Sequence, residues 1–247
     1  MTQEFEGRTA IVTGAASGIG LAVATYLAER GARIAGVDLG AGLEDAMAAL
    51  PGTGHLALMR DLTAPRAADD VVSAVVAETG RLDILVNSAG VVKLAKAVDL
   101  SDEAWDMTIA VNLTASFKMA RAAGAVMTAA GYGRVINLAS QASVVGIDEH
   151  VAYCASKSGI LGMTRVLALE WGGAGVTVNA VSPTVVETPL GKLAWAGEKG
   201  ERHRAEIPVG RFAQPEEIAA MIAYLAGTEA AMVTGQNLVI DGGFTIV

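Results

Sequence analysis

Tyr153 and Lys157 carry side chains that could move a proton, and they stand four positions apart in the segment Tyr153-Cys-Ala-Ser-Lys157. On a helix this spacing places the phenol and the ammonium on the same face. A phenol titrates near pKa 10, so it becomes a useful base at neutral pH only when a neighbouring cation stabilises its phenolate. The pair alone could equally be a solvated helix pair, and further residues are needed to favour acid–base chemistry.

Two more polar residues suit the same chemistry. Ser140 directly follows the apolar run at 134–139, and Asn112 lies inside Ile109-Ala-Val-Asn112-Leu. A hydroxyl at a strand end can donate to an oxygen that alternates between alkoxide and carbonyl, and an amide in a helix could hold a water beside Lys157. Taken singly, Ser140 could be a helix cap and Asn112 a core amide. Together the four residues predict a proton relay that accompanies hydride transfer.

A glycine-rich turn follows the first predicted strand, Thr9–Thr13. Glycines at its tightest points would let the chain turn, approach a pyrophosphate and enter a helix, whose N-terminus then faces the phosphates. Glycines also serve ordinary turns, but the position between a strand and a helix favours dinucleotide binding. The candidate cofactor-binding residues here are Gly14, Ser17, Gly18, Ile19 and Gly20.

Asp38 ends the second predicted strand, 18 residues after Gly20. A carboxylate there can accept hydrogen bonds from the adenosine ribose and would repel a 2′-phosphate. No Arg or Lys occurs in Ala15-Ala16-Ser17 or directly after Asp38, so the sequence predicts NAD rather than NADP. The alternative is an acidic strand end that faces solvent. Further candidates at the same sheet edge, each of which could be turn chemistry alone, are Asp61, Leu62, Asn87, Ala89 and Gly90.

Short apolar runs alternate with longer amphipathic stretches, which predicts a doubly wound α/β Rossmann fold with a seven-stranded parallel sheet and helices on both faces. We expect one domain over 1–247, since no linker, repeat or low-complexity tract divides the chain. The predicted strands are Thr9–Thr13, Arg33–Asp38, His55–Met59, Leu82–Val86, Arg134–Leu138, Thr177–Val181 and Asn237–Ile240.

The stretch at about 188–208 interrupts this alternation before a helix that should begin at Pro215. Insertions after a strand's carboxyl end lie where ligands bind in open α/β sheets, so we expect a lid over the substrate. An ordinary surface excursion is the alternative.

Composition restricts the possible partners and location. The net charge of −8 disfavours nucleic-acid binding, and the sequence contains a single cysteine, Cys154. The N-terminus lacks the pattern of a signal peptide, and the three histidines lack metal-ligand spacing. We therefore expect a soluble, cytoplasmic protein without a catalytic metal, and neither nucleic acid nor membrane as a partner.

With these motifs in place, the chain resembles the short-chain dehydrogenase/reductase family over essentially its whole length. The resemblance implies that Asn112, Ser140, Tyr153 and Lys157 form a catalytic tetrad, and it also implies homotetramers. It further assigns the cofactor's nicotinamide end to Val186 and Thr188, beside Pro183. Two departures stand out: the family's Asn-Asn-Ala-Gly is Asn87-Ser88-Ala89-Gly90 here, and its usual Pro-Gly is Pro183-Thr184.

The second departure, with His150 and Leu193-Ala-Trp195-Ala-Gly, resembles the polyol branch of that family, which includes threitol dehydrogenases and xylulose reductases. Thr184 would narrow the site and add a hydroxyl, while His150 and Trp195 could offer a hydrogen bond and a flat apolar wall to a sugar. The xylulose reductases generally prefer NADPH through a basic residue where this chain has Asp38. We therefore expect NAD-linked oxidation of a small polyol to a ketose.

Two other functions fit parts of the pattern. A 3-oxoacyl-carrier-protein reductase would share the fold and tetrad, but it would favour a basic patch and commonly NADPH, and neither feature is visible. A nucleotide sensor without catalysis would not require the four residues of the tetrad.

Overall fold

Seven parallel strands form one sheet in the order β3-β2-β1-β4-β5-β6-β7 in this computed structural model, which describes residues 3–247 apart from the side chains at 190, 193 and 194. The order reverses direction between β1 and β4, and this switch point opens a crevice at the carboxyl ends of the strands. The predicted doubly wound fold is confirmed. The strands are β1 Thr9–Thr13, β2 Arg33–Asp38, β3 Leu56–Met59, β4 Ile84–Asn87, β5 Gly133–Leu138, β6 Val176–Pro183 and β7 Asn237–Ile240.

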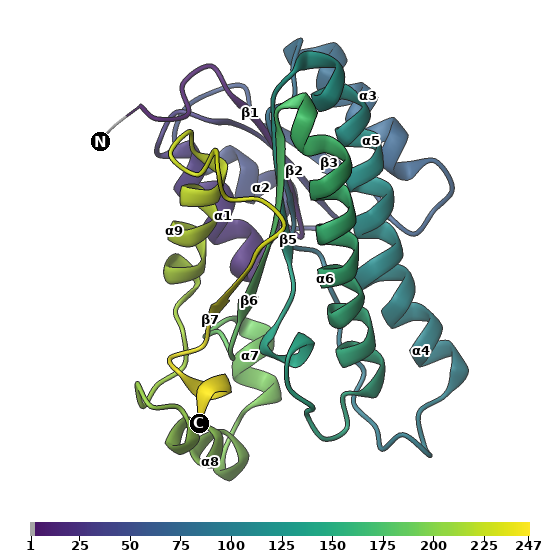
Figure 1. The fold of residues 1–247 in the computed structure, drawn as a ribbon, viewed down its shortest axis with the longest axis vertical. Helices are drawn as coiled ribbons and strands as arrows, with labels where there is room; N and C mark the ends of the chain where they lie inside the picture. The colour runs from purple at the N-terminus through teal and green to yellow at the C-terminus, as the bar shows by residue number, and fades with distance from the viewer. Residues whose placement is uncertain (1–2) are drawn as a thin grey trace.

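Helices cover both faces of the sheet, with α1 and α9 on one side and α4, α5 and α6 on the other (Figure 1). Each face has its own cluster of buried apolar side chains, as expected when amphipathic helices pack on a sheet. The helices are α1 Gly18–Ala28, α2 Leu43–Ala48, α3 Ala67–Thr79, α4 Asp102–Ile109, α5 Ser116–Ala130, α6 Val151–Trp171, α7 Pro189–Ala194, α8 Glu198–Glu206 and α9 Pro215–Ala226. Within residues 3–247, the helices are too short or too polar to cross a membrane.

The strands differ in burial according to their place in the sheet. β1, β4, β5 and β6 are buried along their whole length, whereas the edge strand β3 alternates between half-buried and exposed residues. The other edge strand, β7, is likewise only partly buried, because an edge strand is covered on fewer sides. The buried central strands therefore carry the residues of the crevice at their carboxyl ends.

Residues 188–208 fold mainly as α7 and α8, just beyond the carboxyl ends of the strands (Figure 1). Thr188 begins α7 as its cap, since its Oγ1 accepts a hydrogen bond from the N–H of Gly191 at 3.0 Å and Pro189 occupies the first turn. The segment therefore has its own helical structure, and its covering function stays a prediction.

Candidate active site

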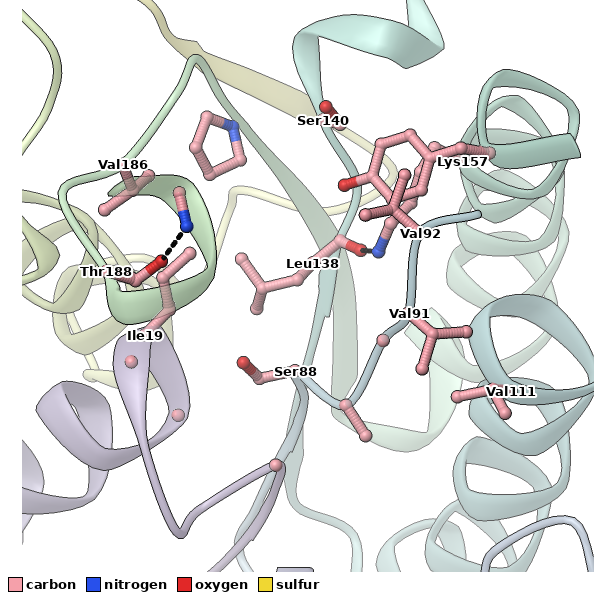
Figure 2. Close-up of a pocket in the computed structure, with 18 of the residues that line it drawn as sticks. Ile19, Ser88, Val91, Val92, Val111, Leu138, Ser140, Lys157, Val186 and Thr188 are labelled. Carbon is pink, nitrogen blue, oxygen red and sulfur yellow. Dashed lines mark hydrogen bonds between the residues drawn. The ribbon is translucent and has the colours of Figure 1, made fainter. Parts of the chain in front are cut away.

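A cleft of about 520 Å³ opens at the carboxyl edge of the sheet. Figure 2 shows Ser140 and Lys157 on one side of it and Ile19, Val186 and Thr188 across from them. All but two of the residues selected from the sequence lie on its wall. They are Gly14, Ser17, Gly18, Ile19, Gly20, Asp38, Asp61, Leu62, Ala89, Gly90, Ser140, His150, Tyr153, Lys157, Pro183, Thr184, Val186, Thr188 and Trp195.

Close backbone contacts explain the glycines of the first turn. A Cβ on Gly20 would lie 2.1 Å from the carbonyl oxygen of Gly14, and Gly14 itself has φ of +70°. Ser17 precedes α1 in an extended conformation without a side-chain cap, so it leaves the first-turn N–H groups uncapped. The turn and the helix end therefore suit an anion such as a pyrophosphate.

Thr13 links this turn to the segment after β4, a contact that sequence reasoning missed. Its Oγ1 accepts hydrogen bonds from the N–H groups of Ser88 and Ala89, both at 3.0 Å. These residues are more than 70 positions away in the chain, so no local pattern could reveal the contact. The bond holds the two walls of the cofactor end together.

Backbone groups fix the Asp38 carboxylate at the end of β2. Its oxygens accept hydrogen bonds from the N–H groups of Ala16, Leu39 and Gly40 at 3.0, 2.7 and 2.8 Å. Arg60 lines the same end of the cleft, because β3 pairs with β2 and places Met59 opposite Asp38. From the sequence, we considered only basic residues close to the glycine turn and to Asp38 in the chain. We therefore missed this cation, which follows the neighbouring strand β3.

Asp61 lines the cleft but is also engaged in a local turn. Its Oδ1 accepts hydrogen bonds from the N–H and the hydroxyl of Thr63 at 2.8 and 2.7 Å, and these bonds lower the pKa of Asp61. The residue therefore also has the turn function that the sequence left open as an alternative.

Asn87 is placed differently from the prediction. Its side chain is buried away from the cleft wall, where Nδ2 donates to the carbonyl of Ser116 at 3.2 Å and to Oδ1 of Asn137 at 2.9 Å. It is the last residue of β4, and its side chain bonds to residues of α5 and β5. The side chain therefore has a structural role beneath the site, and the contact of Asn87 with the cofactor stays a prediction.

Lys157 and Tyr153 meet at the reacting end of the cleft. The Lys157 ammonium lies 5.7 Å from the centroid of the Tyr153 ring and donates to the carbonyl oxygen of Leu138 at 2.6 Å (Figure 2). Burial lowers the pKa of Lys157 to about 8. Burial also raises the pKa of Tyr153, while a hydrogen bond with Ser140 acts in the opposite direction. The phenol therefore depends on nearby cationic charge to become a base.

Asn112 supports this end of the cleft from behind. Its Oδ1 accepts from the N–H of Val91 at 2.8 Å, and its Nδ2 donates to the Val91 carbonyl at 2.9 Å and to Oγ of Ser156 at 3.1 Å. Both amide protons are thus used within the protein, which gives this side chain a positioning role, and the water expected beside Lys157 stays a prediction. The residue lies in a π-helical segment, Ala110–Ala115, between α4 and α5.

Polar and aromatic groups close the far end of the cleft. The Nδ1–H of His150 donates to the carbonyl of Asp148 at 2.6 Å, which leaves Nε2 as an acceptor. Trp195 stacks on the His150 ring with 6.5 Å between centroids. Thr184 and Gln141 also line the wall, and each has a buried oxygen without a hydrogen-bond partner in the described part of the chain. Sequence reasoning did not select Gln141.

A dinucleotide-sized cleft with a phenol, a lysine and a serine at one end defines a nucleotide-dependent oxidoreductase. The family described as enoyl-(acyl carrier protein) reductase matches residues 14–245. The chain belongs to the short-chain dehydrogenase/reductase family of oxidoreductases. Its similar relatives are dehydrogenases that act on CH–OH groups.

Several known proteins are similar along nearly the whole chain. It is 52% identical over 245 residues to D-threitol dehydrogenase of Mycolicibacterium smegmatis, with 98% of this chain and 94% of that protein covered. It is 48% identical over 239 residues to NAD-dependent glycerol dehydrogenase of Listeria innocua, with 97% and 94% covered. A solved structure described as an NAD(P)-dependent gluconate 5-dehydrogenase from Beutenbergia cavernae, with NADP bound at low occupancy, superposes with a TM-score of 0.91 at 36% identity and 100% coverage of both chains.

Proposed function

We propose that this protein is an NAD-dependent dehydrogenase that interconverts a small polyol and its ketose. The likeness to the threitol and glycerol dehydrogenases supports this substrate class. The observation that carries the proposal is the far end of the cleft, where His150, Thr184 and Gln141 offer polar groups around Ser140 and Tyr153. Such convergent hydrogen-bonding groups recognise a substrate with several hydroxyls.

The cleft fits a dinucleotide. The Gly14–Gly20 turn would hold the pyrophosphate, Asp38 the adenosine ribose, and Val186 and Thr188 the carboxamide of the nicotinamide. When bound, the nicotinamide supplies a hydride acceptor for alcohol oxidation.

The chain's own residues handle the proton. The Ser140 hydroxyl donates a hydrogen bond to the substrate oxygen, and the Tyr153 phenolate removes the hydroxyl proton. Lys157 stabilises that phenolate by its charge, and Asn112 keeps the Val91 segment in place beside it.

A substrate screen tests the proposed activity. We expect oxidation of C4 to C6 polyols with NAD at rates well above the reduction of an acetoacetyl thioester with NADPH. The thioester is the substrate of the rival function, a 3-oxoacyl-carrier-protein reductase. Turnover of the thioester alone would overturn the polyol proposal.

Asp38 should set the preference for NAD. In Asp38→Ala, the ribose loses a hydrogen-bond acceptor and a 2′-phosphate no longer meets a carboxylate. We expect the ratio of kcat/KM with NAD to kcat/KM with NADP to fall by about 10- to 100-fold, equivalent to roughly 1.4–2.8 kcal/mol. Arg60→Ala is the matched control, since removing a cation from the same end should not improve NADP use. An unchanged ratio in Asp38→Ala would show that the carboxylate does not select the cofactor.

The proposal extends to a cytoplasmic homotetramer without nucleic-acid or membrane partners. Exposed apolar side chains on α4, α5 and α6, such as Met107, Phe117 and Leu169, support association with other copies of the chain. Sedimentation equilibrium measures the number of chains. The single cysteine in the sequence supports a reducing compartment.

A further inference from the structure

A short hydrogen-bonded chain runs from the substrate end of the cleft to the protein surface. Nε2 of Gln141 lies 3.2 Å from Nε2 of His203, and Nδ1 of His203 lies 3.3 Å from Oε2 of Glu206. Gln141 directly follows Ser140 and lines the cleft. Glu206 lines a separate surface groove of about 300 Å³ near the C-terminus. The His203 ring thus connects two hollows of the molecule.

Aromatic side chains enclose that ring. Trp195 stacks on His203 with 4.4 Å between centroids, and Phe244 meets it edge-on at 4.6 Å. Phe212 lies 6.1 Å away. The His203 side chain is only 8% exposed, so the ring has little freedom to turn. Two groups fix its proton: a carboxylate on one side and an amide on the other.

The partners determine which nitrogen of His203 carries the proton. The amide nitrogen of Gln141 faces Nε2 of His203, an arrangement that suits a donor opposite an acceptor. The carboxylate of Glu206 only accepts, so Nδ1 must carry the proton. Burial lowers the pKa of His203, which favours this neutral form.

This proton placement also fixes the amide of Gln141. If the Gln141 amide were flipped, its oxygen would face Nε2 of His203, and both atoms are acceptors. That contact would be favourable only if the ring proton moved from Nδ1, beside Glu206, to Nε2. Oε1 therefore points away from His203, and it has no hydrogen-bond partner within residues 3–247. A buried acceptor without a partner costs free energy until a donor reaches it.

We propose that His203 and Glu206 are positioning residues that hold the amide oxygen of Gln141 as an acceptor for a substrate hydroxyl next to the reacting carbon. The inference rests on the proposed polyol function and adds a specificity determinant to it. Because Ser140 would contact the reacting oxygen and Gln141 is the next residue, the hydroxyl concerned lies on the neighbouring carbon. An alcohol without that hydroxyl leaves Oε1 of Gln141 unpaired. A substrate with a carbonyl group on the neighbouring carbon would place its oxygen against Oε1, and both oxygens are acceptors.

The kinetic experiment compares D-threitol with 2-butanol, which has four carbons but a single hydroxyl. His203→Phe keeps an aromatic ring among Trp195, Phe244 and Phe212 while removing both hydrogen bonds. We expect its KM for D-threitol to rise about 10-fold with kcat within twofold of wild type, and both constants for 2-butanol to stay unchanged. Gln141→Leu should give the same pattern, and the double variant should be no worse than either single one.

Two further variants separate positioning from packing. His203→Gln can present an acceptor near the lost Nε2 and should restore part of the affinity for D-threitol. Phe212→Leu loosens the same cluster without touching the hydrogen bonds, so it should affect both substrates equally. An equal loss for both substrates in His203→Phe, or an unchanged KM for D-threitol in Gln141→Leu, would refute the proposal.

A measurement without substrate separates this inference from the proposed function. In the ¹⁵N NMR spectrum of the full chain labelled at histidine, we expect His203 to carry its proton on Nδ1, and Glu206→Gln to weaken that preference. A proton on Nε2 in the wild type would overturn the positioning role, whatever the substrate screen shows. Failure of the polyol screen with the expected tautomer present would instead reject the substrate class and, with it, the hydroxyl assigned to Gln141.

Discussion

Tyr153→Phe should lower kcat by about 10³- to 10⁴-fold, because it removes the oxygen that takes the substrate proton in the proposed mechanism. The Lys157 ammonium lies 5.7 Å from the centroid of the Tyr153 ring, and a hydrogen bond with Ser140 lowers the pKa of the phenol against the effect of burial. The bond with Ser140 needs the oxygen that phenylalanine lacks, whereas the ring that lines the cleft remains. NADH affinity, measured by fluorescence titration, should therefore change less than about twofold.

A second tyrosine provides the control for this substitution. Tyr224 lies on α9, is 43% exposed and does not line the cleft, so Tyr224→Phe should leave kcat and NADH affinity unchanged. Turnover by Tyr153→Phe within tenfold of wild type would show that another group serves as the base. Ser140 would then be the next residue to test, since its hydroxyl is the nearest alternative at this end of the cleft.

The sequence predicted the helices and strands well where the residues that define an element lie within a few positions of one another. The ranges Thr9–Thr13, Arg33–Asp38 and Asn237–Ile240 agree with β1, β2 and β7, and α9 begins at Pro215 as expected. Pro at the first turn and the Glu217 carboxylate, which accepts from the N–H of Gln214 at 2.8 Å, are signals within a few residues. The π-helical segment at Ala110–Ala115 was missed because Asn112 bonds there to Val91 and Ser156, both distant in the sequence.

The residues of the candidate site also divide into those that local spacing identified and those whose contacts are distant in the sequence. Spacing on one helix identified Tyr153 and Lys157, and the turn after β1 identified its glycines, because each set is contiguous. Thr13, Arg60 and Gln141 were missed since their contacts depend on which strands are neighbours and on where α8 packs. The direction of the Asn87 side chain was not predictable for a similar reason: a polar side chain at a strand end can face the cleft or the helix beneath it, and only tertiary packing decides between them.

Lys157→Met should reduce activity by about 100-fold or more at pH 7, because in the proposed mechanism the phenol loses the buried charge that makes it a base. The methionine side chain has nearly the same length, so it preserves the shape of the cleft while removing the ammonium. In the wild type, the pKa of about 8 for Lys157 predicts that kcat/KM for oxidation declines as pH rises above 8 and the lysine loses its proton. That decline should be absent in the Met variant, and the matched control Lys118→Met, on α5 away from the cleft, should keep it.

The same substitution should change how stability depends on pH. The pKa of Lys157 is about 8 in the folded chain and near 10.4 when unfolded, so the unfolded chain binds more protons between these values. Stability from this group therefore rises with pH across that window, since the buried lysine is costly while charged and less so once neutral. The unfolding free energy of Lys157→Met minus that of wild type should fall by about 2–3 kcal/mol from pH 7 to pH 10, measured by urea denaturation. If this difference stays constant with pH, the pKa of Lys157 in the folded chain is the ordinary value for lysine. Lys157 would then keep its proton well above pH 8, and its titration could not explain a decline in activity there.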